Sequence, residues 1–473
     1  MKFIPPALLV VLLFASGINA EEKKPNVLLL MSDDLNTALS GFGHPQCKTP
    51  ELDKLAARGV RFENMHCQYP VCGASRASMM TGLYPYTNGM LGNSGNLREN
   101  MPDVITLSQM FRNNNYHVGR VSKIYHMGIP TEIIPGTADH DDPPSWDETV
   151  NIKALEQNAP GVRTEWSPKD KSSQTFTGVE ASTGDLEHAD GMAAEAAIEF
   201  LKRNRDRPFF LGCGFVRPHV PLVAPQKYFD LYDRSTMVAP IFPEGDLDDV
   251  PKVIREYKSN SRYGVTPDLH KGLLQAYYAS VSYMDAQVGR VLDALDELGL
   301  RDNTIVIFTS DHGYLLGHHN KYQKQHLFEE ATRVPFILSV PWLEKTHGEA
   351  TTHLTELIDL YPTIAELVKL SPPETLHGQS MLSLLNDTKS TNWVKEHVFT
   401  ISRSGGESLR THDWRYTHWG YGRKGKELYD LKNDPGEFTN LANDPVHAET
   451  LLQLEKSLRA KREEAGYDPE RFR

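Results

Sequence analysis

The 473-residue chain has few cysteines, no excess of basic residues and, beyond its amino terminus, no long apolar segment. Its four cysteines, Cys47, Cys67, Cys72 and Cys213, are too few to hold together a disulfide-rich scaffold. The 50 Lys and Arg against 62 Asp and Glu give a formal net charge of −12, whereas nucleic-acid-binding proteins usually carry a basic face. We therefore expect a large globular protein with no nucleic-acid partner and no membrane span.

The first 20 residues have the pattern of a removable export signal. Lys2 precedes the short apolar run Ala7–Ala15, and small and polar residues then lead to Ala20. This run is too short to cross a bilayer, which requires roughly 20 apolar residues. We expect residues 1–20 to be a signal peptide and the mature chain to be secreted or periplasmic.

Two apolar runs typical of buried parallel strands each end in a polar pair. Val27–Met31 leads into Asp33-Asp34, and Thr304–Thr309 leads into Asp311-His312. In open α/β sheets, ligands bind beyond the carboxyl ends of the strands. Three carboxylates facing one crevice indicate a hard divalent cation such as Ca²⁺, while the imidazole keeps a transition metal as an alternative. Solvated loop acids are the plainer interpretation of either pair alone.

The spacing of apolar residues predicts helices between these strands. Thr49 as N-cap and Pro50 in the first turn open a helix that buries Leu52 and Leu55. Over 265–300, apolar residues recur at steps of three and four, which predicts a long amphipathic helix. Strands alternating with helices indicate an α/β body with a large mixed, mostly parallel sheet flanked by helices.

The chain changes character after residue 388. Short strands are predicted over His397–Ser402, Leu409–Trp419 and Glu427–Leu431, followed by a charged helix over Ala448–Glu464. The segment 130–185 is rich in Pro, Thr, Asp and Gly and is predicted to form irregular connections. We expect an α/β domain over 21–388 and a small α+β subdomain, with an antiparallel sheet and a terminal helix, over 389–473.

The segment Cys72-Gly73-Ala74-Ser75-Arg76 is the most informative motif of the chain. By its residues alone it is either a buried thiol beside a helix or a thiolate activated by Arg76. Cys-dependent phosphatases need a longer loop between their Cys and Arg. The segment resembles the Cys-x-(Pro/Ala)-x-Arg signature of the sulfatase family, and Thr81–Pro85 (TGLYP) fits the extension of that signature.

The resemblance covers nearly all of the mature chain and implies an alkaline-phosphatase-like fold. In sulfatases a maturation enzyme oxidises the signature cysteine to formylglycine, whose hydrate is the nucleophile, so Cys72 is implied to become that residue. The implied metal ligands are Asp33, Asp34, Asp311, His312 and the modified Cys72. The Asp-His pair is similar to that of iduronate-2-sulfatase-like enzymes, although related phosphonate monoester hydrolases use it too.

Further site residues are implied by the same resemblance. Ser122–His126 is similar to the family's Gly-Lys-x-x-His segment, with Ser in place of Gly. Lys123 is implied to contact nucleophile and sulfate, and His126 to orient the nucleophile. His219 is implied to bind sulfate and protonate the leaving oxygen, Lys324 to bind sulfate, and Arg76 to support residue 72. Taken singly, each Lys or His is more often a surface or core residue.

The sequence therefore predicts a sulfuric ester hydrolase that releases sulfate from a sulfated carbohydrate, such as a 2-O-sulfated uronic acid or another polysaccharide sugar. Its cofactors are expected to be formylglycine and Ca²⁺, with Mg²⁺ or a transition metal as alternatives. One rival is a phosphonate monoester or phosphodiester hydrolase on the same scaffold. The other is a catalytically silent glycan-binding protein. The sequence does not indicate an oligomeric state.

Several residues outside these motifs carry weaker expectations. The histidines at 44, 66, 318 and 319 match no metal-ligand spacing, so we expect loop or surface roles for them. Arg262, Arg403, Arg410 and Trp419 are candidates for contacting a substrate carboxylate or ring. Cys47 and Cys67 either form a disulfide or remain buried thiols.

Overall fold

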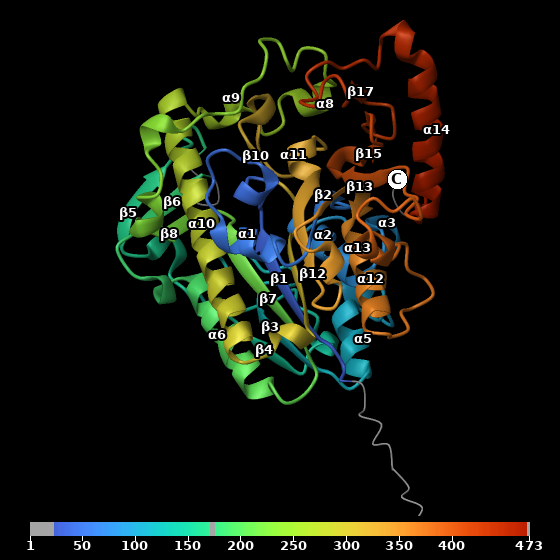
Figure 1. Cartoon of the computed structure of the whole chain (residues 1–473). Coiled ribbons are helices and arrows are strands. Elements are labelled where there is room, and N and C mark those ends of the chain that lie inside the picture. The colour runs from blue at the N-terminus through green and yellow to red at the C-terminus, as the bar shows by residue number, and fades with distance from the viewer. Residues whose placement is uncertain (1–22, 171–175, 471–473) are drawn as a thin grey trace, which may run out of the picture.

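An eight-stranded sheet forms the centre of the computed structural model, which describes residues 23–170 and 176–470 (Figure 1). The signal peptide predicted over 1–20 lies outside the described residues. The strands run in the order β13-β2-β12-β9-β1-β7-β3-β4, and only β12 is antiparallel to its neighbours. Their bounds are β1 Asn26–Asp33, β2 Val60–His66, β3 His117–Ser122, β4 Glu148–Val150, β7 Phe209–Pro218, β9 Thr304–Ser310, β12 Arg333–Ser339 and β13 Ala350–Glu356. The predicted mixed, mostly parallel sheet is confirmed.

Strand β1 is apolar from Val27 to Met31 because both of its faces are covered. It pairs in parallel with β7 on one side and β9 on the other, and all eight of its residues are buried. Leu28 and Leu30 point into one hydrophobic core, while Val27 and Leu29 point into the other. A strand with water on neither face shows a continuous apolar run rather than an alternating pattern.

Helices cover both faces of the sheet, as predicted (Figure 1). One core contains residues of α1 (Pro50–Ala56), α6 (Ala189–Asn204) and α10 (Pro267–Glu297). The opposite core contains residues of α2 (Cys72–Thr81), α5 (Leu107–Asn113), α12 (Leu360–Leu367) and α13 (Leu382–Asn386). The long helix expected over 265–300 is α10. No helix within the described ranges combines the length and the hydropathy needed to cross a bilayer.

Helix α1 lies where the sequence predicts it, but its cap differs from the expectation. Thr49 occupies the N-cap position, yet its side chain caps no helical N–H and instead accepts a hydrogen bond from the Ser40 N–H (3.0 Å). The carboxylate of Asp285 in α10 accepts hydrogen bonds from the backbone N–H groups of Glu51 (3.1 Å) and Leu52 (2.8 Å). A buried acid from a distant helix therefore accepts hydrogen bonds from two of the free N–H groups at the start of α1.

The carboxyl-terminal part of the chain forms a second, antiparallel sheet with strands in sequence order. Its strands are β14 Val398–Ser402, β15 Gly406–Arg410, β16 Trp414–His418 and β17 Lys426–Asp430, and α14 (Ala448–Glu464) follows. The single strand predicted over Leu409–Trp419 is wrong, because a turn closed by the Thr411 N–H and the Trp414 carbonyl (2.8 Å) separates β15 from β16. Phe399 and Leu409 share a core with Ala74 of α2, so this sheet packs on the first turn of that helix.

Short elements make up the remaining connections. Within the segment predicted to be irregular, β5 (Gly161–Glu165) and β6 (Thr177–Ala181) form a three-stranded sheet with β8 (Leu222–Pro225). The residues of β5 (GVRTE) and β6 (TGVEA) form neither an apolar run nor an alternating pattern, so the sequence does not mark them as strands. The other short elements are α3 Pro85–Asn88, α4 Leu97–Asn100, α7 Gln226–Phe229, α8 Lys252–Arg255, α9 Asn260–Tyr263, α11 Glu329–Thr332, β10 Leu315–Leu316 and β11 Tyr322–Gln323.

All four cysteines are free thiols and all are buried. Cys47 lies in the core that contains Leu28, whereas Cys67 lies in the opposite core with Leu29. The two thiols are therefore on opposite faces of the central sheet, and the alternative of buried thiols holds for this pair.

The cap on α1 generates a pH-dependent prediction. Burial raises the pKa of Asp285 to about 7, although the N–H groups of Leu52 and Glu51 oppose the shift. Because this pKa lies above the ordinary value of 3.8, the contribution of Asp285 to stability is lost as the pH rises through about 7. Asp285→Asn keeps one acceptor without the charge. We therefore expect the difference in free energy of unfolding between Asp285→Asn and the wild type to shift in favour of the variant from pH 5 to pH 8. Urea denaturation at the two pH values measures it.

Two further variants test the same cap. Asp285→Ala leaves the two N–H groups without an acceptor and should lose about 1–3 kcal/mol at pH 5. Asp293→Asn, on the exposed side of the same helix, is the control and should change stability by less than about 0.5 kcal/mol at either pH. An Asp285→Asn variant that differs from the wild type equally at both pH values would contradict the prediction.

Candidate active site

The site lies where the carboxyl ends of four adjacent strands meet. Asp33 ends β1, Lys123 follows β3, His219 follows β7, and Asp311 follows β9. These strands are neighbours in the order β9-β1-β7-β3 and all run parallel. Their carboxyl ends therefore share one edge of the sheet, which brings together residues that are far apart in the chain.

Cys72 lies at the centre of this group, as the first residue of α2. Its Sγ is 3.4 Å from Asp33 Oδ1, 3.5 Å from His312 Nε2 and 3.0 Å from Lys324 Nζ. The side chain is completely buried. Burial alone would raise the pKa of the Cys72 thiol, but the charges of Lys123 and Lys324 outweigh it and hold that pKa well below its usual range.

The five predicted metal ligands converge in two overlapping groups that share Asp33 and Cys72. In the first, one atom of each of these residues lies within 4.8 Å of the ligand atoms of Asp311 and His312. In the second, the same limit holds for Asp33, Cys72, Asp34 and His219. The sequence assigns His219 to substrate alone, so its place in the second group is new.

His312 is oriented by its own loop. Its Nδ1 is hydrogen-bonded to the Gly313 carbonyl (2.9 Å), which leaves Nε2 to face the carboxylates, 3.3 Å from Asp34 Oδ1. A backbone carbonyl that fixes one ring nitrogen is the usual support of a metal-binding histidine. Burial would lower the pKa of His312, but the Asp311 carboxylate outweighs it and the pKa rises to about 9.

The donor set fits a divalent cation. Asp33, Asp34 and Asp311 are all buried, and none of them is more than 1% exposed. Burial raises the pKa of Asp311 to about 6, even though Arg76 opposes the shift. Three buried carboxylates at one point attract a hard cation, and carboxylate oxygens are the ligands that Ca²⁺ and Mg²⁺ prefer. The imidazole of His312 adds one nitrogen donor once a bound cation displaces its Nε2 proton.

Three basic side chains neutralise these carboxylates. Lys123 Nζ lies 2.5 Å from Asp33 Oδ2, and Lys324 Nζ lies 2.6 Å from Asp34 Oδ1. Arg76 Nε donates to Asp311 Oδ2 at 2.8 Å. Each acid is thus paired with a cation from a different segment of the chain, and breaking any one pair would leave a buried charge uncompensated.

Arg76 is buried completely and joins several segments. Besides its bond to Asp311, it donates to the backbone carbonyls of Lys123 (2.7 Å), Ile124 (3.1 Å) and Ser32 (3.2 Å). The cavity of the site is not lined by its side chain. Arg76 therefore holds α2, β1 and the loop after β3 in one arrangement, as a support of the site.

The loop that carries Lys123 approaches β7 very closely. A Cβ atom on Gly214 would lie 1.9 Å from the Lys123 carbonyl oxygen, so only glycine fits at that position of β7. Ser122, which stands where sulfatases have Gly, has a φ of 56° in the left-handed region. The backbone requirement explains why glycine suits this position, and Ser122 adopts the same conformation at some cost.

His219 and His126 face the same cavity as Lys324. His219 Nδ1 is hydrogen-bonded to the Val220 carbonyl (2.6 Å), and Nε2 lies 3.7 Å from Asp34 Oδ2. Burial lowers the pKa of His126, which favours the neutral ring. The structure thus brings all ten residues of the predicted site into one region.

The cavity beside Cys72 has a volume of about 340 Å³. Its lining includes four polar residues that sequence reasoning missed: Asn93, Thr131, Tyr314 and Gln323. Asn93 Oδ1 also accepts a hydrogen bond from the Gly73 N–H (2.9 Å), next to Cys72. Asn93, Thr131 and Tyr314 lie in loops and Gln323 ends the short strand β11. None of the four belongs to a motif recognised in the sequence, so only the folded chain reveals them.

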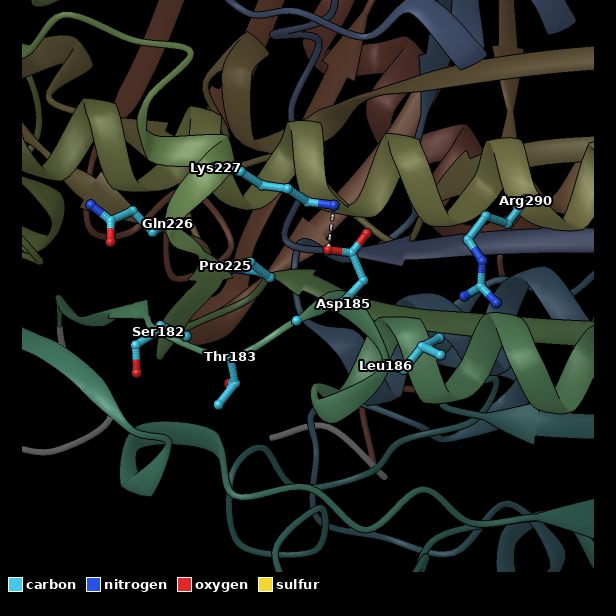
Figure 2. A pocket seen from close by; sticks show the side chains of 10 residues that line it. Ser182, Thr183, Asp185, Leu186, Pro225, Gln226, Lys227 and Arg290 are labelled. Atoms are coloured by element: carbon cyan, nitrogen blue, oxygen red, sulfur yellow. Dashed lines mark ion pairs between the residues drawn. The ribbon is translucent and has the colours of Figure 1, made fainter.

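A larger hollow, of about 670 Å³, lies elsewhere, beside the carboxyl end of β8 (Figure 2). Lys227 pairs with Asp185 at 2.8 Å across it, and Asp185 also accepts a hydrogen bond from Tyr228. Arg290 pairs with Glu195 at 2.6 Å. None of the described residues that line this hollow is a histidine or a cysteine, so it lacks the reactive groups of the smaller cavity.

Several weaker expectations are corrected. His66 and His319 are buried rather than on the surface. His66 faces the Glu329 carboxylate at 4.0 Å, and His319 stacks on the ring of Phe328 with Asp246 3.0 Å from its Nδ1. Arg410 and Trp419 are also buried, with Arg410 3.5 Å from Glu329, so neither is available to a substrate. Arg403 is exposed and stacks over the ring of Tyr257 at 4.4 Å.

Comparison with known proteins identifies relatives whose similarity extends over all the residues of the candidate site. The sulfatase family model matches residues 25–370, and the model of the N-sulphoglucosamine sulphohydrolase carboxyl-terminal region matches residues 317–464. A sulfatase of Formosa agariphila is 31% identical, covering 90% of this chain and 85% of its own length. The iduronate 2-sulfatase of Homo sapiens is 30% identical, covering 91% and 93%.

A solved structure shares the fold at lower identity. The phosphonate monoester hydrolase of Silicibacter pomeroyi superposes with a TM-score of 0.77 and 21% identity, covering 93% of this chain and 95% of that one. The likeness confirms the alkaline-phosphatase-like fold expected from the sequence. At this level of identity the likeness supports the fold of the chain and says nothing about its reaction.

The acidic cluster generates a metal-binding prediction. Asp34→Asn removes one carboxylate charge and should weaken Ca²⁺ binding at least about tenfold. Asn tolerates the left-handed backbone found at Asp34 (φ 62°), so the loop should keep its shape. Isothermal titration of metal-stripped protein measures the affinity. Asp302→Asn, at an exposed position, is the matched control, and unchanged affinity in the Asp34 variant would exclude this residue as a ligand.

Proposed function

The chain belongs to the sulfatase family and is a sulfatase, and we propose that it releases sulfate from a sulfated carbohydrate. The observation that carries the proposal is the position of Cys72. The signature cysteine lies 3.0 Å from Lys324 Nζ and 3.4 Å from Asp33 Oδ1, beside a polar cavity. A nucleophile, a cation for the anionic group and an acidic metal-binding cluster therefore meet at one point.

The nucleophile is proposed to arise from Cys72 by oxidation to formylglycine in a maturation enzyme. When formed, that residue supplies a hydrated aldehyde whose hydroxyl attacks sulfur. The Cys72 side chain is completely buried in the folded chain, which supports oxidation before folding. The position of residue 72 at the start of α2, and the bond of Arg76 to Asp311, keep it next to Lys324, which lines the cavity.

Asp33, Asp34, Asp311 and His312, with residue 72, are proposed to hold a divalent cation, most naturally Ca²⁺, which polarises the sulfate and acidifies the nucleophile when bound. Three carboxylates around a dication still leave one negative charge, which would repel a sulfate ester. Lys123 and Lys324 overcome that repulsion, and their fixed ammonium groups stabilise charge on the sulfate oxygens as the ester bond breaks.

His219 is proposed to protonate the leaving oxygen. A sugar alkoxide is a poor leaving group, so its departure needs a proton from a positioned acid. The hydrogen bond from Nδ1 to the Val220 carbonyl fixes the ring, and Nε2 is then the nitrogen on the side of Asp34 and the cavity. His126 lies on the same cavity and is proposed to orient the nucleophile.

The substrate is proposed to be a sulfated sugar, with a 2-O-sulfated uronic acid as the first choice. A relative named for iduronate supports a uronic acid. The cavity of about 340 Å³ lies at the small end of ligand pockets, and its Asn, Thr, Tyr and Gln side chains suit hydroxyl groups. The signal-like amino terminus supports a secreted or periplasmic location.

Mass spectrometry of the peptide containing Cys72 tests the nucleophile. In protein from its native host we expect the mass of an aldehyde at residue 72, and Cys72→Ala should lose at least about 1,000-fold in sulfatase turnover because the nucleophile is gone. Cys213→Ala, at a buried thiol outside the site, is the control and should keep turnover. An unmodified thiol at residue 72 in fully active protein would exclude the formylglycine mechanism.

A comparison of esters tests the reaction. We expect kcat/KM for a 2-O-sulfated uronic-acid disaccharide to exceed that for a phosphate diester of similar size by more than about tenfold. Both esters carry one negative charge, but the sulfate offers three non-bridging oxygens to the cations of the site, whereas the diester offers two and carries a second ester group. Faster turnover of the diester would reassign the chain to the phosphodiester hydrolases. Binding of sulfated oligosaccharides without turnover by protein modified at residue 72 would instead make it a silent glycan-binding protein.

A further inference from the structure

Arg217 lies at the carboxyl end of β7, two residues before His219. It is 1% exposed, and its guanidinium donates to three different partners. Nε donates to the Val223 carbonyl (2.9 Å) and Nη1 to the His219 carbonyl (3.0 Å). Nη2 pairs with both carboxylate oxygens of Glu156, at 2.8 and 2.7 Å. One side chain thus ties together both arms of the turn between β7 and β8.

Glu156 anchors the guanidinium. Its side chain is 1% exposed, and its carboxylate pairs with Arg217 through both oxygens. A buried ion pair of this kind is strongly directional, and removal of one partner leaves an uncompensated charge in the core. Glu156 belongs to the segment between β4 and β5, so it fixes the turn from outside.

The backbone of Arg217 is held just as firmly. Asp190 of α6 accepts hydrogen bonds from the N–H groups of Val216 (2.7 Å) and Arg217 (3.1 Å). Ser32 of β1 donates its hydroxyl to the Arg217 carbonyl (2.7 Å). The main chain before the turn is therefore fixed to α6 and β1, and the Arg217 side chain fixes the main chain of the turn itself and of β8.

We infer that Arg217, anchored by Glu156, is a positioning residue that holds His219 in place to protonate the leaving oxygen. The inference rests on the proposed function. With its carbonyl bound by Arg217 and its Nδ1 bound by Val220, His219 is left with Nε2 as its free nitrogen. Lysine cannot replace the planar fork, because a single ammonium does not reach two carbonyls and a carboxylate together.

The test compares two sulfate esters that differ in their need for a proton. The leaving group of a sugar sulfate is a basic alkoxide, so its hydrolysis depends on the acid. The leaving group of 4-nitrophenyl sulfate is a stabilised phenolate, so its hydrolysis depends on the acid little. Arg217→Lys and Glu156→Gln should each lower kcat/KM for the sugar sulfate by at least about tenfold and that for the nitrophenyl ester by less than about threefold. Arg203→Lys, an Arg on the surface of α6, should leave both unchanged.

A double-mutant cycle with His219→Ala completes the experiment. If Arg217 acts through His219, Arg217→Lys should cause no further loss for the sugar sulfate once His219 is alanine. Equal losses for both esters, or additive losses in the cycle, would overturn the inference. Glu156→Gln decides the matter if Arg217→Lys is unstable, since it keeps the size of the side chain.

The outcomes separate this inference from the proposed function. Absence of turnover of every sulfate ester by wild-type protein modified at residue 72 contradicts the proposed function. A selective loss for the sugar sulfate in His219→Ala, without the same selectivity in the Arg217 and Glu156 variants, leaves the proposed function standing and removes the positioning role alone. A His219→Ala variant with no selectivity overturns both the acid role of His219 and this inference.

Discussion

The structure depends on the compensation of buried negative charge at the carboxyl edge of the parallel sheet. Asp33, Asp34 and Asp311 are all removed from water, and each would destabilise the fold by several kcal/mol if left unpaired. The chain answers with cations from three separate segments, Lys123, Lys324 and Arg76. Compensation therefore ties distant parts of the chain together. The same cations favour the binding of an anionic substrate by a protein whose formal net charge is −12.

Much of the site is predictable because its residues directly succeed apolar strands or belong to a compact motif. Asp33 and Asp311 are predicted from their position at the end of an apolar strand, and Cys72 is predicted from its spacing to Arg76. Hydrogen bonds and ion pairs between segments distant in the chain cannot be predicted in this way. Asp285 caps a helix more than 200 residues away, and the partner of Arg217 is Glu156, in a region that appears irregular in sequence. Neither pair leaves a local pattern.

Burial is the property that interpretation of the sequence most often gets wrong. His66 and His319 are polar, isolated and off any ligand spacing, yet both lie in the interior. Both are buried against segments distant in the chain, His66 beside Glu329 and His319 beside Asp246, and no local period reveals such contacts. The change from the mostly parallel sheet to the antiparallel sheet lies between β13 and β14, and the boundary expected at residue 388 stays a prediction. The interior is continuous across this change, because Phe399 and Leu409 share a hydrophobic core with Ala74.

The contact between α2 and the last sheet has a consequence for the order of events during synthesis. The chain emerges from the ribosome amino terminus first, so Cys72 is exposed long before β14–β17 exist. The hydrophobic neighbours of Ala74 are completed only when those strands arrive. Until then the helix that carries Cys72 lacks part of its packing. If Cys72 is oxidised as proposed, the arrival of β14–β17 therefore ends the period in which a modifying enzyme can bind this segment.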